Sequence, residues 1–284
     1  MRVRSEVVTT RDRIQPDVAT AAASLAQRLA EPVARLSSDA KVHHAMMQLA
    51  PAAPSLLGMV VGFGASYAVA SLAESTLHDK VHHAPPETRK TWDRLGTLGR
   101  WLKTAYLGHS GVHHGATYKT DHVTQFASPE AHDKLAKKLT ASGHEILVKE
   151  DFGVTIGWAG VAKFLAPVAP VYAAVAGAAI ALGASPAALV AGALAVPLLP
   201  LASKLTHKYM HMSEPEIDQT ASTPMRWLLK SSLGKWVTRR HFVHHAREEG
   251  VNFNLLPGGD ILRGKDSAPT PQEMAEMRRL RMNV

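Results

Sequence analysis

The chain of 284 residues is long enough for one large or two small domains and for a sizeable buried core. It has no cysteine, which excludes disulfides, cysteine-type zinc fingers and thiolate-held iron–sulfur clusters. Its formal net charge of +8 comes from Lys and Arg side chains that are spread over the polar segments without a nucleic-acid-binding signature. We therefore expect these charges to face an anionic membrane surface. We expect no binding to nucleic acid.

Residues 1–50 begin with basic side chains and continue into a stretch rich in Ala and Leu. Arg28, Glu31 and Arg35 interrupt this stretch, and charges this frequent argue against a membrane-spanning helix. No uninterrupted apolar run follows the basic residues, as a signal peptide would require. We expect an N-terminal amphipathic or surface segment over residues 1–50.

Two long apolar stretches predict membrane-spanning helices. The first, residues 51–73, has no charge before Glu74 and just reaches the ~20 residues that a bilayer core requires. The second, residues 154–203, contains Lys163 as its only charge and a Gly-Ala-Ser-Pro turn at 183–186, so it predicts a hairpin of two helices. Its many Gly and Ala residues suit helix packing in lipid better than the buried core of a soluble protein. The predicted fold class is all-α, an integral-membrane helical bundle.

The topology of these spans has two solutions. Basic residues flank the first span on both sides, and one span plus one hairpin places a basic N-terminus outside, against the positive-inside tendency. Either the N-terminal segment lies on the membrane, or residues 51–73 do not cross it fully.

Polar segments alternate with the apolar stretches. Residues 84–151 are basic and contain a Trp- and Leu-rich amphipathic segment at 91–107 that suits an interfacial helix. The chain ends in a basic tail over 266–284. We expect one membrane domain over 51–265, between the N-terminal segment and this tail.

Eleven of the sixteen histidines fall into four clusters with helical spacing. Side chains three and four positions apart lie on one face of an α-helix, so each cluster can direct its imidazoles at a single centre. The members are His78, His82, His83, His109, His113, His114, His207, His211, His241, His244 and His245. A tetrahedral zinc takes ~4 ligands, so eleven imidazoles are too many for a single zinc and suffice for two metal ions.

A nitrogen-rich pair of metal ions suits oxygen activation. Imidazole holds iron in both oxidation states without a thiolate that would itself be oxidised. The zinc-protease motif is missing, since His144-Glu145 is not followed by a histidine at the required spacing. Carboxylates near the clusters are candidates for orienting the rings through their second nitrogen. These candidates are Asp79, Asp121, Glu248 and Asp260.

The histidine boxes and the apolar stretches between them resemble the fatty acid hydroxylase superfamily of membrane di-iron oxygenases, which includes sterol desaturases. The resemblance covers about residues 52–265 and is most specific at the C-terminal end. There Asn252-Phe253-Asn254 and the segment 260–264 resemble the Asn-Phe-Gly and Asp-x-Leu-Phe-Gly endings of the family, with Arg263 in place of the usual aromatic residue. The second box also departs from many relatives, with three residues instead of two before its His-His pair.

The resemblance implies a compact bundle of membrane helices with a histidine-rich helical cap on the cytoplasmic side. It implies a membrane-bound non-haem di-iron oxygenase that hydroxylates or desaturates a lipid, such as a fatty acyl chain or a sterol, with O2 as co-substrate. Two Fe ions would be held by the eleven clustered histidines, of which His82 is the uncertain member because the first box can be read with either spacing. Electrons would come from an external ferredoxin or reductase chain, since the sequence carries no recognisable flavin, haem or ferredoxin domain.

Two other classes of function remain open from the sequence. A membrane metal-binding or metal-transport protein would use the histidines to pass or sense an ion, and it would place ionisable residues inside the spans. Lys163 alone meets that condition. A soluble or peripheral helical protein would use its histidines as pH-responsive surface charges and would hold no stoichiometric iron.

Overall fold

The computed structural model describes residues 53–181, 184–247 and 250–284, and over these ranges it is helical without a β-strand. Its one β-bridge joins Ser213 to Met282. Residues Gly58–Val284 form one compact unit. The predicted amphipathic segment at 1–50 lies outside the described residues, and so does Glu248.

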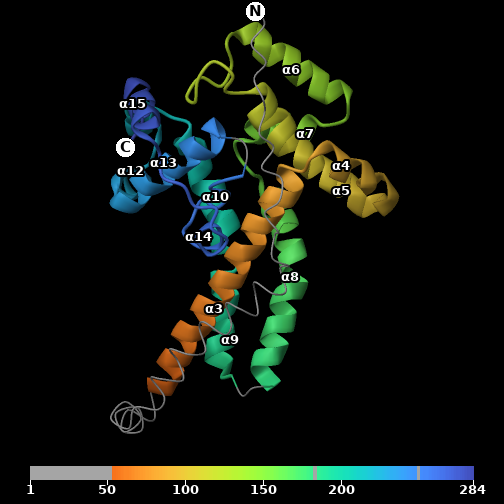
Figure 1. Cartoon of the computed structure of the whole chain (residues 1–284), viewed down its shortest axis with the longest axis vertical. Coiled ribbons are helices and arrows are strands. Elements are labelled where there is room, and N and C mark those ends of the chain that lie inside the picture. Colours follow the sequence, from red (N-terminus) through yellow and green to blue (C-terminus); the bar gives the residue numbers. More distant parts are fainter. Residues whose placement is uncertain (1–52, 182–183, 248–249) are drawn as a thin grey trace, which may run out of the picture. The chain divides into compact units, whose positions relative to one another are not determined.

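The apolar stretches form four helices, the first two of which are the longest among the described residues (Figure 1). Their bounds are α3 (Ala53–Leu77), α8 (Trp158–Ala181), α9 (Pro186–Ala195) and α10 (Leu198–Met210). Two helical runs, Leu56–His82 and Pro186–Met210, are long and apolar enough to cross a membrane, and the second joins α9 to α10 through a turn at 196–197. The first continues from α3 into the π-helix η1 (His78–His82), so the first histidine box ends the same helix that begins as a candidate span.

Helices α3 and α9 pack at a glycine. A Cβ atom added at Gly62 would collide with the backbone carbonyl of Ala188, so only glycine permits this approach. The outward faces of these helices are apolar, and Val60, Val61 and Val190 are each 60–62% exposed. Small residues therefore hold the helices together while larger aliphatic side chains cover their outer surface.

We expect Gly62→Val to lower the free energy of unfolding by about 1–3 kcal/mol, because the new side chain must push α9 away from α3. Thermal unfolding in detergent measures this loss. Gly64→Val is the matched control, since no atom of a neighbouring element lies within 4 Å of its Cβ position. Equal melting temperatures for the two variants would contradict the packing described here.

The predicted interfacial segment at 91–107 is helical but divided. The 3₁₀ turn η2 (Trp92–Leu95) is followed by α5 (Gly96–Tyr106), and Gly96 at the junction has a φ of +56° that favours glycine. Helix α5 then runs directly into a second π-helix, η3 (Leu107–His114), which carries the second histidine box. The other elements of this region are α4 (Pro86–Thr91), α6 (Pro129–Ala141), α7 (Glu145–Lys149) and η4 (Asp151–Gly153).

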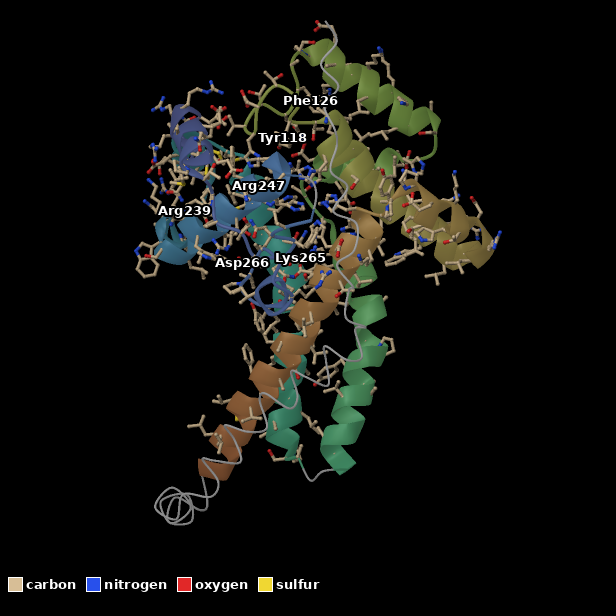
Figure 2. The ribbon with its side chains drawn as sticks, viewed as in Figure 1. Tyr118, Phe126, Arg239, Arg247, Lys265 and Asp266 are labelled. Atoms are coloured by element: carbon tan, nitrogen blue, oxygen red, sulfur yellow. The ribbon has the colours of Figure 1, made fainter. Side chains whose placement is uncertain are left out.

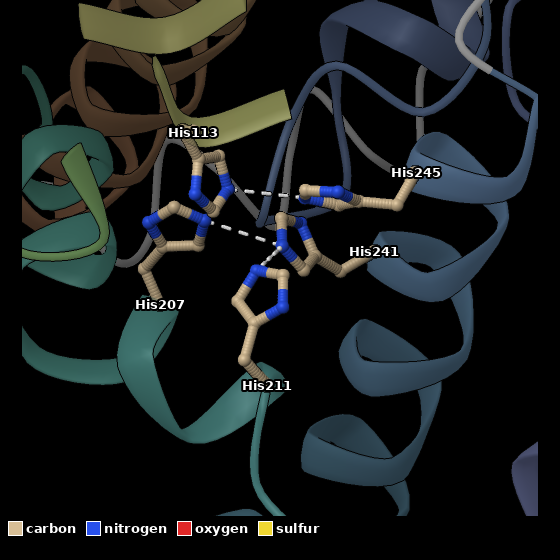
Figure 3. Close-up of side chains that lie close together, drawn as sticks. All are labelled: His113, His207, His211, His241 and His245. Carbon is tan, nitrogen blue, oxygen red and sulfur yellow. Dashed lines mark hydrogen bonds between the residues drawn. The ribbon is translucent and has the colours of Figure 1, made fainter. Parts of the chain in front are cut away.

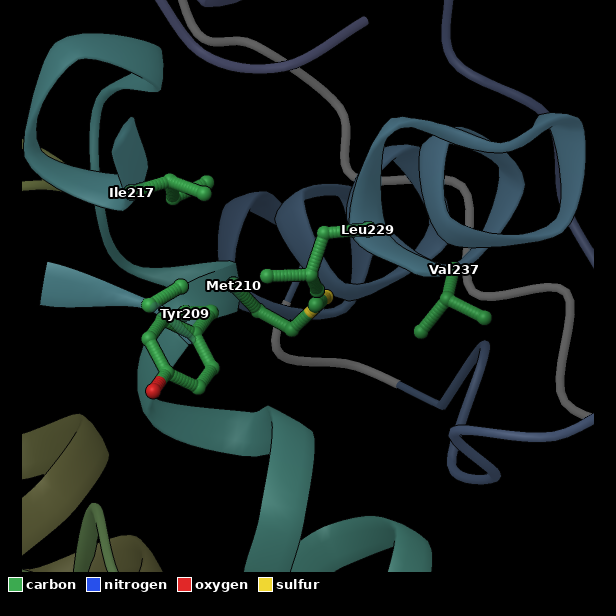
Figure 4. Packing of buried hydrophobic residues seen from close by; sticks show 6 residues of the cluster. Tyr209, Met210, Ile217, Leu229 and Val237 are labelled. Carbon is green, nitrogen blue, oxygen red and sulfur yellow. The ribbon is translucent and has the colours of Figure 1, made fainter. Parts of the chain in front are cut away.

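The C-terminal third is a set of short helices around its own apolar core. The helices are α11 (Glu214–Thr220), α12 (Thr223–Lys230), α13 (Ser232–Ala246), α14 (Gly259–Leu262) and α15 (Pro271–Arg279). Met210 at the end of α10 is buried among Ile217, Leu229 and Val237 (Figure 4). This core fixes α10 against α13, the two helices that carry the third and fourth histidine boxes.

The tail predicted at 266–284 contains α15, which packs on α13. Met277 is fully buried against Phe242. Arg247, directly after α13, pairs with Glu273 at 2.5 Å, and Arg240 on α13 pairs with Asp266 at the same distance; Arg247 and Asp266 are labelled in Figure 2. The outer side of α13 is thus held by apolar and ionic contacts, which leaves its other side for the histidines.

Candidate metal centre

The four histidine boxes meet although their residues lie up to 167 positions apart in the sequence, from 78 to 245. They come from η1, η3, α10 and α13, and from the residues His83 and His211 that directly follow η1 and α10. Nine of the eleven clustered histidines form two compact groups, and in each group one ligand nitrogen of every member lies within 4.8 Å of the others.

The five-histidine group consists of His113, His207, His211, His241 and His245 (Figure 3). The Nε2 atom of His241 lies 2.9 Å from that of His211 and 3.2 Å from that of His207. The Nε2 atoms of His113 and His245 are 3.1 Å apart. All members except the partly buried His245 are buried. The group can therefore present several ring nitrogens to one small ion.

The four-histidine group consists of His78, His83, His109 and His244. The Nε2 atom of His109 is 2.8 Å from that of His78 and 3.2 Å from that of His83. The Nε2 atoms of His83 and His244 are 3.3 Å apart. This group joins η1 and η3 to one residue of α13.

The helix type decides which histidines share a group. In a π-helix the backbone N–H bonds to the carbonyl five residues earlier, and His83 makes this bond to His78 at 3.1 Å. His78 and His83 therefore face one group together, while His82 lies beside it. In η3, His109 and His113 are four apart and would share a face of an α-helix, yet they enter different groups.

The expectation that each box points at a single centre is thus wrong for two boxes. His241 and His245 on α13 enter the five-histidine group, whereas His244 enters the four-histidine group. Consecutive residues of an α-helix point in directions about 100° apart, so neighbours in sequence can serve different centres. His114 lies between the groups, with its Nε2 atom 3.0 Å from that of His109 and its ring centroid 4.0 Å from that of His245.

Hydrogen bonds among the rings cannot give every facing ring nitrogen a partner. A neutral imidazole nitrogen carries either one proton or one lone pair. The Nε2 atom of His109 approaches three other Nε2 atoms, those of His78, His83 and His114, at 2.8–3.2 Å, and one proton can serve only one of them. A cation accepts all such lone pairs at once, so the donor set fits metal ions.

Burial keeps these rings neutral. Loss of hydration, and second the repulsion between neighbouring rings, lowers the pKa of His109, His211, His241 and His245 well below the ordinary value. Burial lowers the pKa of His244 to about 4. These imidazoles are therefore neutral at pH 7, and each can offer a lone pair to a metal ion without first losing a proton.

Backbone carbonyls orient two of the rings. The Nδ1 atom of His211 donates to the carbonyl of His122 at 3.1 Å, and that of His244 donates to the carbonyl of Val251 at 3.0 Å. Each bond places the proton on Nδ1 and leaves the lone pair of Nε2 for the group. In contrast, the Nδ1 atoms of His82, His113 and His114 are buried and have no partner among the described residues.

The carboxylates proposed as ring-orienting groups have other partners. Asp79 pairs with Arg263 at 2.5 Å. Asp121 accepts from the backbone N–H groups of Val123 and Thr124, and so closes a turn. Asp260 accepts from Asn254 and from Ser75. None of these three candidate carboxylates forms a hydrogen bond with an imidazole of the two groups among the described residues, and the acceptors of His211 and His244 are backbone carbonyls.

The Asn-Phe-Asn segment fastens the C-terminal loop to α3. The Nδ2 atom of Asn254 donates to the Oε2 atom of Glu74 at 2.6 Å, and its backbone N–H donates to Asp260 at 2.5 Å. The ring of Phe253 lies with its centroid 5.4 Å from that of His78 and 5.7 Å from that of His244. The loop thus covers one side of the four-histidine group with an aromatic ring.

Arg263 has a role that the sequence pattern alone does not give. Its guanidinium donates to the backbone carbonyl of Ser75 at 2.6 Å and to Asp79 at 2.5 Å. It therefore ties α14 and the following turn to the last turn of α3, next to His78. An aromatic residue at this position could not make these charge-assisted bonds.

Sequence reasoning did not select His122 and Tyr118 as part of the site. His122 is buried, and its ring centroid lies 4.4 Å from that of His211 and 5.0 Å from that of His245. Its Nε2 atom donates to the carbonyl of Met210 at 3.2 Å. Tyr118 stacks on His211 with ring centroids 4.1 Å apart. The available signal in the sequence was a further histidine eight residues after a histidine box.

A cavity of about 460 Å³ reaches both groups. His78, His82 and His109 line it, and His207 and His241 do so as well. Most of the remaining wall is apolar, with residues such as Leu77, Val81 and Ile156. The cavity can hold an apolar chain beside the histidine nitrogens.

We expect the metal-free protein to lose stability as the pH falls from 7 to 5. The ordinary histidine pKa is 6.5, whereas His244 in the folded chain has a pKa of about 4. Between these values the unfolded chain binds more protons than the folded chain, so acid favours unfolding. Melting temperatures of chelator-treated protein across this pH range measure the effect.

Two comparisons make this test specific. His132→Gln removes an exposed histidine that pairs with Asp133, and it is expected to leave the pH dependence unchanged. Metal-loaded protein is expected to resist the pH change, because a bound ion competes with protons for the same lone pairs. A flat melting profile for the metal-free wild type would contradict the neutral, buried state of the rings.

No protein-family model matches the chain, and neither a curated protein nor a solved structure matches it significantly.

Proposed function

We propose that the chain is a membrane-bound non-haem di-iron oxygenase that hydroxylates or desaturates a lipid. The observation that supports this proposal best is the contact of two separate histidine groups, one buried and one half-buried, with one largely apolar cavity. Each group has enough imidazoles for one ion, and the resemblance to the fatty acid hydroxylase superfamily suggests iron for both.

The donor set is compatible with iron. It consists of imidazole nitrogens without a thiolate, and imidazole suits iron among several transition metals. His113, His207, His211, His241 and His245 would hold one ion; His78, His83, His109 and His244 would hold the other. When bound, the two irons supply the activation of O2 that attack on an unactivated C–H bond requires.

The protein's own residues would position the lipid and exclude water. Leu77, Val81 and Ile156 offer an apolar wall to a hydrocarbon chain. His207 and His241 line the cavity from one group, and His78 and His109 line it from the other. A carbon of the bound chain would therefore lie next to both groups, and the cavity shape would select which carbon is oxidised.

Hydroxylation consumes one O2, two electrons and two protons for each lipid and releases one water. Desaturation consumes the same reactants and releases two waters. Both outcomes need an external electron donor, and a ferredoxin or a reductase chain fits the absence of a recognisable redox domain in the sequence.

We place the protein in a membrane with the histidines at the cytoplasmic boundary. The two helical runs that are long and apolar enough to span, Leu56–His82 and Pro186–Met210, both have histidines at their C-terminal ends. The apolar outer faces of α3 and α9 suit contact with lipid tails. Basic segments around the histidine boxes agree with the cytoplasmic side.

A metal-transport function is the second candidate, because Glu74 is a buried carboxyl inside the first helical run and lines the cavity. Glu74 accepts a hydrogen bond from Asn254 and therefore also has a structural role. Transport predicts uptake of metal into vesicles that contain the protein, without an oxidised lipid.

Iron analysis of detergent-purified protein, loaded anaerobically with Fe(II), is the first test. We expect about two irons per chain, since each histidine group fits one ion. His211→Gln and His83→Gln each remove one ligand from a different group, so each should lower tightly bound iron to about one per chain. His132→Gln should retain both irons, because its side chain is exposed and belongs to neither group.

Lipid profiling of cells with and without the chain is the second part of this test. A new hydroxylated or desaturated lipid that requires O2, and that both ligand variants abolish, is the expected result. Full iron loading without any oxidised lipid, in the presence of a reductant, would count against the oxygenase and in favour of the transport candidate.

A further inference from the structure

One face of α5 and the start of η3 forms a continuous wall of the cavity. The side chains on this wall recur every three or four residues, as one face of a helix requires. They belong to Thr97, Arg100, Trp101, Thr104, Ala105 and Gly108. His109 of the four-histidine group follows directly.

The two ends of this wall differ in exposure and in charge. Thr97 and Arg100 are exposed, whereas Gly108 is buried. The Nη2 atom of Arg100 donates to the Oγ1 atom of Thr97 at 2.9 Å. No carboxylate in the part of the chain that the structure describes forms an ion pair with Arg100. The mouth of the cavity thus presents a guanidinium with free N–H donors.

The carboxylate of Glu150 also lines the cavity, but it comes from the end of α7 and not from this wall. Its Oε1 atom accepts the backbone N–H of Gly157 at 2.9 Å. Glu150 is therefore engaged by the turn that leads into α8, and Arg100 remains the cation at the exposed end of α5.

The wall sets a distance between the guanidinium and the metal ligands. His109 lies nine positions after Arg100, which corresponds to about 14 Å along a helix. Three bonds of an extended chain span about 3.6 Å, so about eleven bonds of a hydrocarbon chain cover this distance.

We propose that Arg100 and Thr97 bind the anionic headgroup of a single-chain lipid, whose chain lies along α5 and reaches the histidines near its middle. The headgroup is a carboxylate, as in a fatty acid, or a phosphate monoester, since both accept from the fork of N–H donors of arginine. The assignment of the oxidised position rests on the proposed oxygenase function; the headgroup site does not.

Binding to metal-free protein tests the headgroup site without any turnover. Stearic acid brominated within a few carbons of its carboxyl group should quench the fluorescence of Trp101, which lines the cavity directly after Arg100. We expect the acid to bind the wild type about tenfold more tightly than its methyl ester, because charge-assisted hydrogen bonds are lost with the ester.

Arg100→Gln should abolish that difference by weakening the acid about tenfold and leaving the ester unchanged. Arg94→Gln is the matched control, since Arg94 is an exposed arginine on η2 that does not line the cavity. Trp101→Phe should remove most of the quenching, which assigns the signal to this cavity. Melting temperatures establish that each variant is folded.

Competition between lauric acid and dodecyl phosphate decides which anion the site prefers. Either preference supports the proposal if Arg100→Gln removes that preference.

Equal affinity for acid and ester in the wild type, or an unchanged affinity for the acid in Arg100→Gln, would overturn the proposal. If the acid binds through Arg100 but no oxidised lipid forms with iron and reductant, the proposed function fails while the headgroup site stands. In active enzyme, Arg100→Gln should spread oxidation over several carbons.

Discussion

The structure depends on a cluster of neutral ring nitrogens that cannot satisfy one another. Buried polar atoms need partners, and an imidazole nitrogen that faces three others has at most one proton to share. Burial prevents the alternative of protonation, since it lowers the pKa of these rings far below neutrality. Unpaired ring nitrogens cost free energy of folding. The other contacts of the fold offset this cost, because they hold the four helical segments together.

Three of the four segments that carry histidines are fixed by contacts outside the two groups. Met210 anchors α10 in the C-terminal core, and Phe242 and Met277 attach α15 to the outer side of α13. The hydrogen bonds of Asn254 and Arg263 fasten the C-terminal loop to the end of α3. The histidines therefore sit on rigid elements and need little reorganisation to receive an ion.

The sequence was sufficient to predict the all-helical class, the apolar helical runs and the presence of histidines at their ends, because hydropathy and helical spacing are local properties. It was insufficient to predict how the histidines divide between the groups. The π-helical turns in η1 and η3 change which residues share a face, so that His78 joins His83, while His109 and His113 separate. The acceptors for His211 and His244 are backbone carbonyls, which no residue pattern encodes. Iron and lipid oxidation rest on the resemblance and stay predictions.

His244 and His245 are adjacent on α13 but belong to different groups. The peptide unit between them is rigid, and the helix transmits any small rotation to both rings at once. An ion that shifts one ring slightly therefore also shifts the other. Each ion would then affect the affinity of the second group through this one helix, although each group keeps its own set of ligands.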